Sequence, residues 1–450
     1  MIPWARTARL FIRSGVFLAV PSAACDRPPA EQDMGAGSAH FTVEDSAGIE
    51  IVENHAPEHP PGEFWTIDAE PEIVLGGGGA RPGEDPAAAR DPAQLIWEVA
   101  GIARLQDGRV AVLSQGNHQL YLFEPSGELS RVIGGRGEGP GEFVRPQLLQ
   151  YLAPDTLAVW DYWFGGTSYF DTGGDLIRER SFDIREMMDQ ALGANAESRF
   201  HPLPDGSFVV MARGTPPTSE PRPGSVVREP AKHYMRIGGS YSAQSLGHWE
   251  GVDEWYPAGG WDFPGFPTLR VDSYIAAGGN PPSIYLANGE RNEIRQFSLD
   301  GTLVRIMRRT VAPVPVTEEA HREWQRFLSF EAPLGDMEPQ PGRTWEEFFA
   351  AIPRRESYPP VAGLVVDAEG YLWVREWSEE ARGGIPDQWS IFGPDGRWLG
   401  VVRGLPVYHA CRWYFVPCWV DRDFLLTIQV DNQGVESVEG YRIRRGDEGP

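Results

Sequence analysis

The chain lacks several features that would assign it quickly to a class. No stretch reaches the roughly 18 consecutive apolar residues that a membrane-spanning helix needs. Basic residues are scarce, with 40 Lys and Arg against 64 Asp and Glu, which gives a formal net charge of −24. A field of that sign repels phosphate backbones and anionic lipid surfaces, so nucleic acid is not an expected partner. Cysteine is also rare, with 3 in 450 residues.

Local catalytic and metal-binding motifs are missing as well. The 9 histidines form no H-x-H or H-E-x-x-H pair of the kind a local zinc site uses. His55 and His59 have i, i+4 spacing, but Pro57 between them disfavours a helix. There is no G-x-S-x-G elbow, and no thiol lies beside a plausible base. The sequence therefore predicts no metal, no cofactor and no catalytic residue.

What is present begins with an export signal. Residues 1–24 contain a basic region, a short apolar stretch and small residues before a cysteine: Arg6, Arg9 and Arg13, then residues 15–20, then Ser22, Ala23 and Ala24. Around Cys25 this signal peptide resembles a bacterial lipobox, in which the cysteine is lipidated and becomes the mature N-terminus. Ser22 stands where that pattern prefers Leu, and cleavage after Ala24 by an ordinary signal peptidase is the alternative. Residues 25–40 are Pro-rich and polar, as expected of a tether.

The other two cysteines, Cys411 and Cys418, lie close together in the sequence. An exported protein folds in an oxidising compartment, where a disulfide closing so short a loop stabilises the fold by roughly 2–3 kcal/mol. The sequence thus suggests a disulfide between Cys411 and Cys418, with two buried free thiols as the alternative.

The organising feature of the rest of the chain is a repeat. Residues 101–135 contain four short apolar-alternating segments separated by Gly- and Asp-containing turns, a pattern typical of successive β-hairpins. The second strands of copies two to five read LAVWD, FVVMA, IYLAN and LWVRE, and a weaker sixth copy spans about 414–444. In copies one, two and four the two turns are about 18–19 residues apart, which indicates a true structural repeat.

Six four-stranded units bury each other when they pack radially around an axis. This predicts an all-β, six-bladed β-propeller over residues 41–445, whereas an all-β sandwich would not need six copies in phase. Residues 41–76 precede the first full copy and are expected to supply an outer strand to the last blade. The stretch GGRGEGPGEFVRP at 134–146 resembles the NHL-repeat signature, and the chain resembles bacterial six-bladed propeller lipoproteins related to NHL proteins. Asp161 keeps the Asp that NHL blades carry after the second strand, whereas Ser114, Ala212 and Asn288 replace it.

The phase of the repeat places the ends of the second strands, with the connections between blades, at one mouth of the central channel. Aromatic faces with a few charged groups at a concave mouth are typical of ligand binding. We therefore predict a ligand-binding site formed by Arg145, Asp161, Trp163, Asn288, Glu376 and Trp377. The alternative for each is an ordinary loop residue or an aromatic that packs blades together.

A long insertion at about 311–360, between blades four and five, falls on the same face. Apolar residues at i, i+4, i+7 and i+8 from Ala320 predict an amphipathic helix after Thr317. A Thr344-x-x-Glu347 capping box predicts the start of a second helix. Both helices are expected to pack on the blades, and we hypothesise that the insertion roofs the mouth.

Together these features favour an exported, lipid-anchored binding or scaffold module at the cell envelope, either periplasmic or on the surface. Its expected ligand is a protein, a glycan or a small molecule at the propeller mouth, and membrane contact is expected only through the lipid anchor. The resemblance also implies an alternative, a metal-dependent propeller lyase or lactonase, because propeller sites draw their ligands from distant blades. A purely structural role in the envelope is a third possibility.

Overall fold

A computed structural model describes most of the chain after residue 39. The described residues are 40–60, 62–76, 96–161, 165–181, 196–203, 205, 207–212, 222–228, 232–237, 243–249, 253–258, 269, 271–331, 342–381, 386–403, 419–430 and 436–445. The chain divides into two units, Met1–Ala39 and His40–Pro450. The predicted signal peptide, most of the tether and Cys25 therefore lie outside the described residues, as do Cys411 and Cys418.

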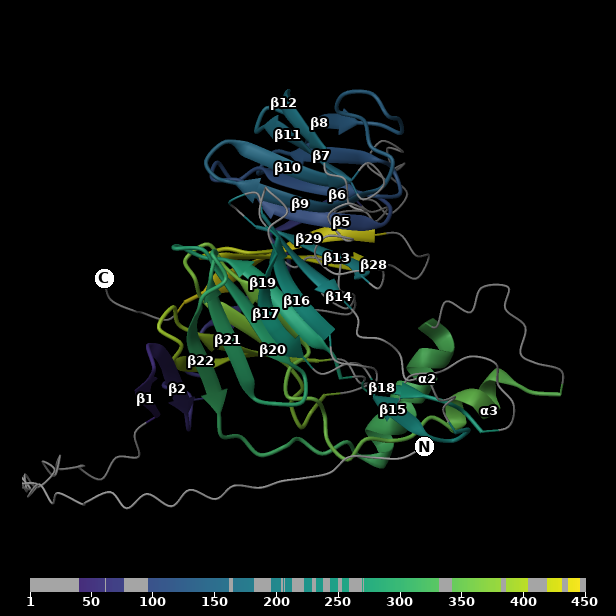
Figure 1. Ribbon diagram of the computed structural model, residues 1–450. Coiled ribbons are helices and arrows are strands. Elements are labelled where there is room, and N and C mark those ends of the chain that lie inside the picture. Colours follow the sequence, from purple (N-terminus) through teal and green to yellow (C-terminus); the bar gives the residue numbers. More distant parts are fainter. Residues whose placement is uncertain are drawn as a thin grey trace, which may run out of the picture. The chain divides into compact units, whose positions relative to one another are not determined.

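The described part of the second unit contains six sheets, the blades, which follow one another along the chain, and one further two-stranded sheet (Figure 1). The strands that form the repeat pair in antiparallel fashion within each blade. Blade one contains β5 (Val99–Arg104), β6 (Val110–Ser114), β7 (Gln119–Phe123) and β8 (Leu129–Gly134); blade two contains β9 (Pro146–Leu152), β10 (Thr156–Asp161), β11 (Gly166–Asp171) and β12 (Leu176–Ser181). Blade three contains β13 (Ala196–Pro202), β14 (Phe208–Ala212), β16 (Lys232–Ile237) and β17 (Ala243–Trp249); blade four contains β19 (Ser273–Gly278), β20 (Ser283–Asn288), β21 (Glu293–Ser298) and β22 (Leu303–Arg309). Blade five contains β23 (Gly363–Val366), β24 (Leu372–Glu376), β25 (Gln388–Phe392) and β26 (Trp398–Arg403); blade six contains β27 (Trp419–Val420), β28 (Phe424–Val430) and β29 (Glu436–Arg444). The prediction of a six-bladed β-propeller is confirmed.

The repeat has a local cause in its turns. In blade one, Asp107 accepts a hydrogen bond from the Arg109 backbone N–H at 3.1 Å, and Gly108 takes a φ of 86°. Glycine adopts that left-handed conformation without the steric cost that a Cβ brings. The second hairpin repeats the device, since Gly127 has a φ of 83° and donates its N–H to the Glu124 carbonyl at 2.8 Å. Turn chemistry therefore sets the hairpin register in both halves of the blade.

Most of the hydrophobic core lies between neighbouring blades. One buried cluster joins blades one and two through Leu113, Leu149 and Phe170. Others join blade three to four, four to five, five to six, and six to one. Arg104 of blade one also pairs with Asp423 of blade six at 3.3 Å. Contacts between the first and last blades close the ring, which buries the two sheet faces that would otherwise be exposed at its ends.

The segment before blade one divides between two blades, so its predicted role is half right. β4 (Ile73–Gly76) pairs with β29 and, together with β3 (Thr66–Ile67), supplies the outer edge of blade six. The preceding hairpin, β1 (Phe41–Ser46) and β2 (Ile49–Asn54), instead extends blade four, because β2 lies parallel to β22. Two ion pairs hold it there: Arg305 with Glu50, and Arg308 with Glu53 at 3.0 Å.

The insertion between blades four and five contains the two predicted helices, α2 (Glu318–Glu331) and α3 (Trp345–Ala350). Thr344 caps α3 with both hydrogen bonds of the capping box. A two-stranded ribbon from blade three, β15 (Val226–Arg228) with β18 (Asp253–Trp255), lies beside these helices (Figure 1). The insertion therefore packs against blade three as well as its own neighbours. Neither described helix is long and apolar enough to cross a membrane.

Candidate functional site

The residues that end the second strands hold the connections between blades. Asp161, 4% exposed, accepts hydrogen bonds from the backbone N–H groups of Val144 and Arg145, both at 2.8 Å. In blade one, Ser114 occupies the same position and accepts the Trp97 N–H at 3.3 Å. Asn288 in blade four accepts the Glu290 N–H at 2.8 Å. This repeat position thus satisfies backbone donors in the nearby loops.

Glu376 takes part in a buried ion pair between blades four and five. Its carboxylate receives Arg309 Nη2 at 2.6 Å and Nη1 at 3.2 Å, and the side chains are 10% and 5% exposed. Ser390 donates its hydroxyl to Glu376 and accepts Arg309 Nη1 at 2.7 Å. The guanidinium also lies 5.0 Å from the centre of the Trp398 ring. The charge of Glu376 is therefore matched inside the fold.

Trp377 lies beneath the insertion. It is 7% exposed and stacks on Tyr358, with ring centres 5.5 Å apart. Val316 and Ala320 of the insertion share the same buried cluster. Burial raises the pKa of the Tyr358 phenol, and the nearby Asp387 raises it further. These contacts pack the insertion against the end of blade five, and its role as a roof over the mouth stays a hypothesis.

The structure does not bring the six predicted ligand residues into one described cavity. Arg145 and Asp161 meet at the entrance to blade two, whereas Glu376 and Trp377 lie at the end of blade five. Trp163 lies outside the described residues. Ligand binding at the mouth stays a prediction.

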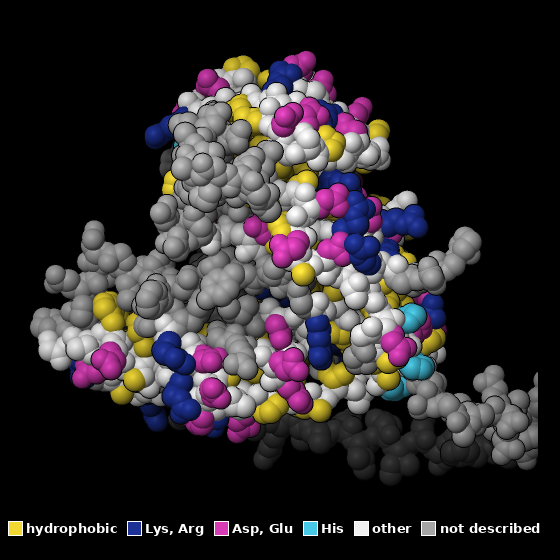
Figure 2. Space-filling view, turned by 180° about the vertical axis from the view of Figure 1, so that it is seen from behind, with side chains coloured by type: hydrophobic (Ala, Val, Ile, Leu, Met, Phe, Trp, Pro, Cys, Tyr) yellow, Lys and Arg dark blue, Asp and Glu magenta, His cyan; other side chains and the backbone are white. Residues whose placement is uncertain are grey.

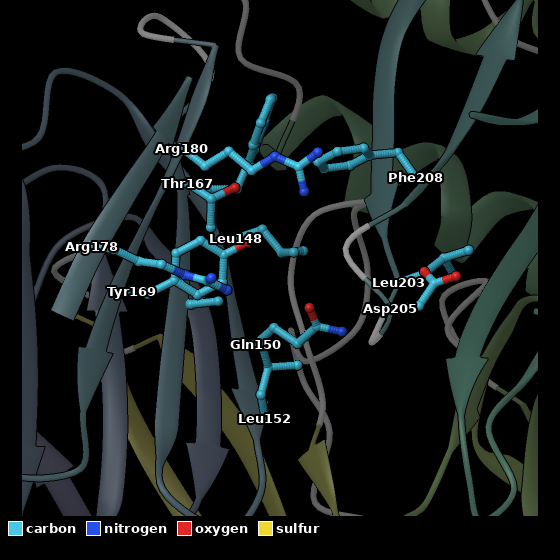
Figure 3. Close-up of a pocket in the computed structure, with 12 residues that line it drawn as sticks. Leu148, Gln150, Leu152, Thr167, Tyr169, Arg178, Arg180, Leu203, Asp205 and Phe208 are labelled. Atoms are coloured by element: carbon cyan, nitrogen blue, oxygen red, sulfur yellow. The ribbon is translucent and has the colours of Figure 1, made fainter. Parts of the chain in front are cut away.

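A separate pocket lies between blades two and three (Figure 3). We call it the blade two–three pocket. It has a volume of about 130 Å³ and is lined by Leu148, Gln150, Leu152, Ala158, Trp160, Thr167, Tyr169, Arg178, Arg180, Leu203, Asp205 and Phe208.

Strand alternation explains why these residues share one face. The pairing of β9, β10, β11 and β12 sets two rows of side chains across blade two: Leu148, Trp160, Thr167 and Arg180, then Gln150, Ala158, Tyr169 and Arg178. The residues between them point to the opposite face, where Leu149 and Val159 pack against blade one. The second row has the small Ala158 at its centre, which leaves space between Gln150 and Tyr169.

The pocket combines buried aromatic walls with basic groups at its rim. Trp160, Tyr169 and Phe208 are 3%, 6% and 4% exposed, and the Trp160 and Phe208 rings lie 5.2 Å apart across the two blades. Arg178 and Arg180 are exposed. In Figure 3, Arg180 extends over the pocket toward Phe208, while Gln150 points its amide into the space.

Asp205 is the acidic group of this pocket, and its charge is compensated. It receives Arg236 Nη2 at 2.7 Å and the Ser207 N–H at 2.9 Å. Burial opposes ionisation of Asp205, but the Ser207 hydrogen bonds and Arg236 together lower its pKa below the ordinary value. Elsewhere, acidic and basic side chains are interspersed on the face shown in Figure 2.

The pocket was not predicted from the sequence. Its one available signal is the alternation Arg178-Glu179-Arg180, which puts two basic side chains on one face of an outer strand. That signal does not identify the blade-three residues of the pocket, because Asp205 and Phe208 reach the pocket only through the packing of the two sheets. Among the described residues, no three His, Cys, Asp or Glu side chains lie close enough to hold a metal ion.

Comparisons with known proteins agree with the fold. The DUF5128 family model, described as a 6-bladed beta-propeller, matches residues 94–189. A Bacteroides fragilis NCTC 9343 protein, inferred to be exported, has a similar structure with 11% identity and a TM-score of 0.43, covering 88% of this chain and 99% of that one. A duf4221 family member from Bacteroides vulgatus ATCC 8482 has 9% identity and a TM-score of 0.44, covering 85% and 99%.

An enzyme is also among the similar structures. A gluconolactonase from Xanthomonas campestris shares 12% identity with a TM-score of 0.34, covering 84% of this chain and all of its own (100%). Among curated proteins, none matches the chain. At these identities the likenesses concern the fold alone.

Proposed function

We propose that this propeller is an exported binding protein of the cell envelope whose ligand occupies the blade two–three pocket. One observation carries the choice of site. The pocket presents polar groups that the fold does not use: within the described part of the chain, neither Arg178 nor Gln150 makes a side-chain hydrogen bond or an ion pair. An arginine and an amide at the edge of an aromatic pocket are typical of a site that orients a small ligand.

The predicted site at the mouth is the second candidate. Asp161 and Glu376 already serve the fold there, the first holding a loop and the second matched by Arg309. A ligand that paired with either carboxylate would have to replace an existing partner. This cost favours the blade two–three pocket over the mouth.

The location in the cell envelope rests on the N-terminal sequence. The basic region, apolar stretch and small residues before Cys25 support export, and the resemblance to a lipobox supports lipidation. Intact mass measurement of the mature protein tests this part. A mass that corresponds to a chain starting at a diacylated or triacylated Cys25 supports the anchor, and an unmodified N-terminus contradicts it.

Binding in the pocket is tested by filling it. We expect Ala158→Leu to abolish the binding of the small molecules that bind to the wild-type chain. Ligand-observed NMR with a panel of neutral sugars, sugar acids, amino acids and aromatic acids measures this binding. Val132→Leu is the matched control, because Val132 is 40% exposed on an outer strand of blade one. Binding that survives Ala158→Leu in a folded protein would contradict the pocket as the site.

The enzymatic alternative is a metal-dependent lyase or lactonase. A metal assay on the purified full chain distinguishes such an enzyme from a binding module. Stoichiometric calcium or zinc, together with loss of activity toward lactones on chelation, would favour the enzyme. Binding that is unchanged by chelation supports a binding module.

A further inference from the structure

We propose that the blade two–three pocket selects small ligands carrying a carboxylate on a single six-membered ring, with Arg178 as the principal anion contact. This inference rests on the proposed function, since it names the ligand class of the same pocket. Uronic acids and aromatic carboxylic acids share this chemistry, and the experiment below separates the two sources.

Arg178 is already oriented for an anion. Its guanidinium carbon lies 4.4 Å from the centre of the Tyr169 ring. Stacking of this kind occupies the face of the planar guanidinium and leaves its N–H edges available, and these edges match a carboxylate in bidentate geometry. The stacked ring also restricts the side chain, so less rotamer freedom is lost when a ligand binds.

A second arginine near the pocket is already paired, since Arg236 of blade three contacts Asp205 of the pocket lining at 2.7 Å. Arg178 forms no ion pair within the described part of the chain. No described carboxylate pairs with this guanidinium, so it provides a local attraction that acts against the repulsion of an anionic ligand by a net charge of −24.

Gln150 provides a second donor in the same row of side chains. It lies on β9 and Arg178 on β12, with Ala158 and Tyr169 between them. Figure 3 shows the Gln150 amide directed into the pocket below Arg178. A carboxylate in this space receives charge-assisted hydrogen bonds from Arg178 and an amide N–H from Gln150, without displacing an existing bond.

The walls and the volume define the rest of the ligand. A volume of about 130 Å³ is below the ~300–1,000 Å³ of pockets for drug-sized molecules, so the pocket accommodates one small ring rather than an extended chain. Trp160 and Tyr169 present aromatic surface to it, which packs well against a flat apolar face. Asp205 does not oppose an anion strongly, because Arg236 neutralises it.

The test is calorimetric titration of the full mature chain with glucuronate and benzoate, each beside its neutral counterpart, glucose and benzyl alcohol. We expect at least one acid to bind roughly tenfold or more tightly than its neutral counterpart. Binding of glucuronate indicates a sugar source, and binding of benzoate indicates an aromatic one. The inference is overturned if neither acid binds more tightly than its neutral counterpart, or if neither acid binds at all.

Variants separate this inference from the proposed function. Arg178→Lys keeps the charge but loses the bidentate fork, and we expect it to weaken acid binding by about tenfold or more. Arg403→Gln is the control, because Arg403 is exposed on blade five and bonds only Gln388 among described residues. If Ala158→Leu abolishes binding of a neutral ligand while Arg178→Lys changes nothing, the pocket is a binding site and the carboxylate class is wrong.

Discussion

Two junctions of the same ring differ in how they are filled. Between blades four and five, Tyr285 and Ala287 pack with Leu372 and Phe392 in one buried cluster. A buried ion pair, Arg309 with Glu376, crosses the same junction. Between blades two and three, Trp160 meets Phe208, but a pocket of about 130 Å³ lies beside this contact.

The difference shows how a repeated fold separates stability from function. Both junctions contain the corresponding strands of the repeat, and β2 is added to blade four at the filled junction. Side-chain size and pairing also differ: Ala158 of blade two stands where blade four has Tyr285, and among the described residues Arg178 has no ion-pair partner such as Glu376 provides for Arg309. We expect substitutions at the filled junction to lower the free energy of unfolding more than comparable substitutions at the hollow junction.

The largest effect is expected for Arg309→Leu. This substitution leaves the Glu376 carboxylate buried without its partner, and breaking such a pair costs about 3–5 kcal/mol of unfolding free energy. Urea denaturation of the full chain, followed by circular dichroism, measures the loss.

The double variant Arg309→Leu/Glu376→Leu is the control for this prediction. Replacing both charges with apolar side chains removes the uncompensated charge, so most of the lost stability should return. If the double variant is as unstable as Arg309→Leu alone, the effect comes from packing around Trp398 rather than from the buried charge.

A pair of identical truncations compares the junctions directly. Leu372, 1% exposed, belongs to the filled junction, and Leu148, half-buried, lines the pocket. Leu372→Ala is expected to cost about 2–5 kcal/mol, because it creates a cavity in packed surroundings. Leu148→Ala should cost about 1 kcal/mol or less, because its side chain already borders open space. Equal losses in thermal or urea unfolding would contradict the comparison.

The repeat made the fold predictable from the sequence. Alternating apolar residues and Asp-Gly turns such as Asp107-Gly108 act locally, so each blade could be recognised without its neighbours. The capping box at Thr344 is likewise local, and α3 begins where it predicted. The hairpin at residues 41–54 was misplaced because its pairing with β22 joins segments about 250 residues apart, which no local pattern encodes.

The site was harder to predict because it depends on contacts between blades. Glu376 was chosen for its place at the end of a strand, but its partner Arg309 comes from the preceding blade. Arg178 and Gln150 belong to one row only through the register of four strands. The residues of such a row can be predicted once the pairing of the strands is known. The space beside Ala158 cannot, because it depends on how blade three packs against blade two.

Asn54 tests whether the added hairpin also strengthens the filled junction. It is 1% exposed and donates to the carbonyls of Arg308 and Gly396, both at 3.2 Å, while accepting the Trp398 N–H at 2.8 Å. Asn54→Ala leaves buried backbone groups without partners, at a cost of about 1–3 kcal/mol. Thermal unfolding measures this, with Thr42→Ala on the exposed β1 as the control. Equal, small effects would show that the hairpin is only attached at the surface.

The smallest effect concerns the charge inside the pocket. The pKa of Asp205 is lowered below 3.8, since the bonds from Ser207 and Arg236 outweigh burial. A depressed pKa contributes stability that is complete above 3.8 and is lost as the pH falls through the folded-state value. Because the carboxylate is partly exposed, Asp205→Asn should cost at most about 1 kcal/mol at neutral pH. The difference from wild type should shrink as the pH falls below 3.8 in urea titrations, and a pH-independent difference would assign the loss to packing against Ser207 instead of to charge.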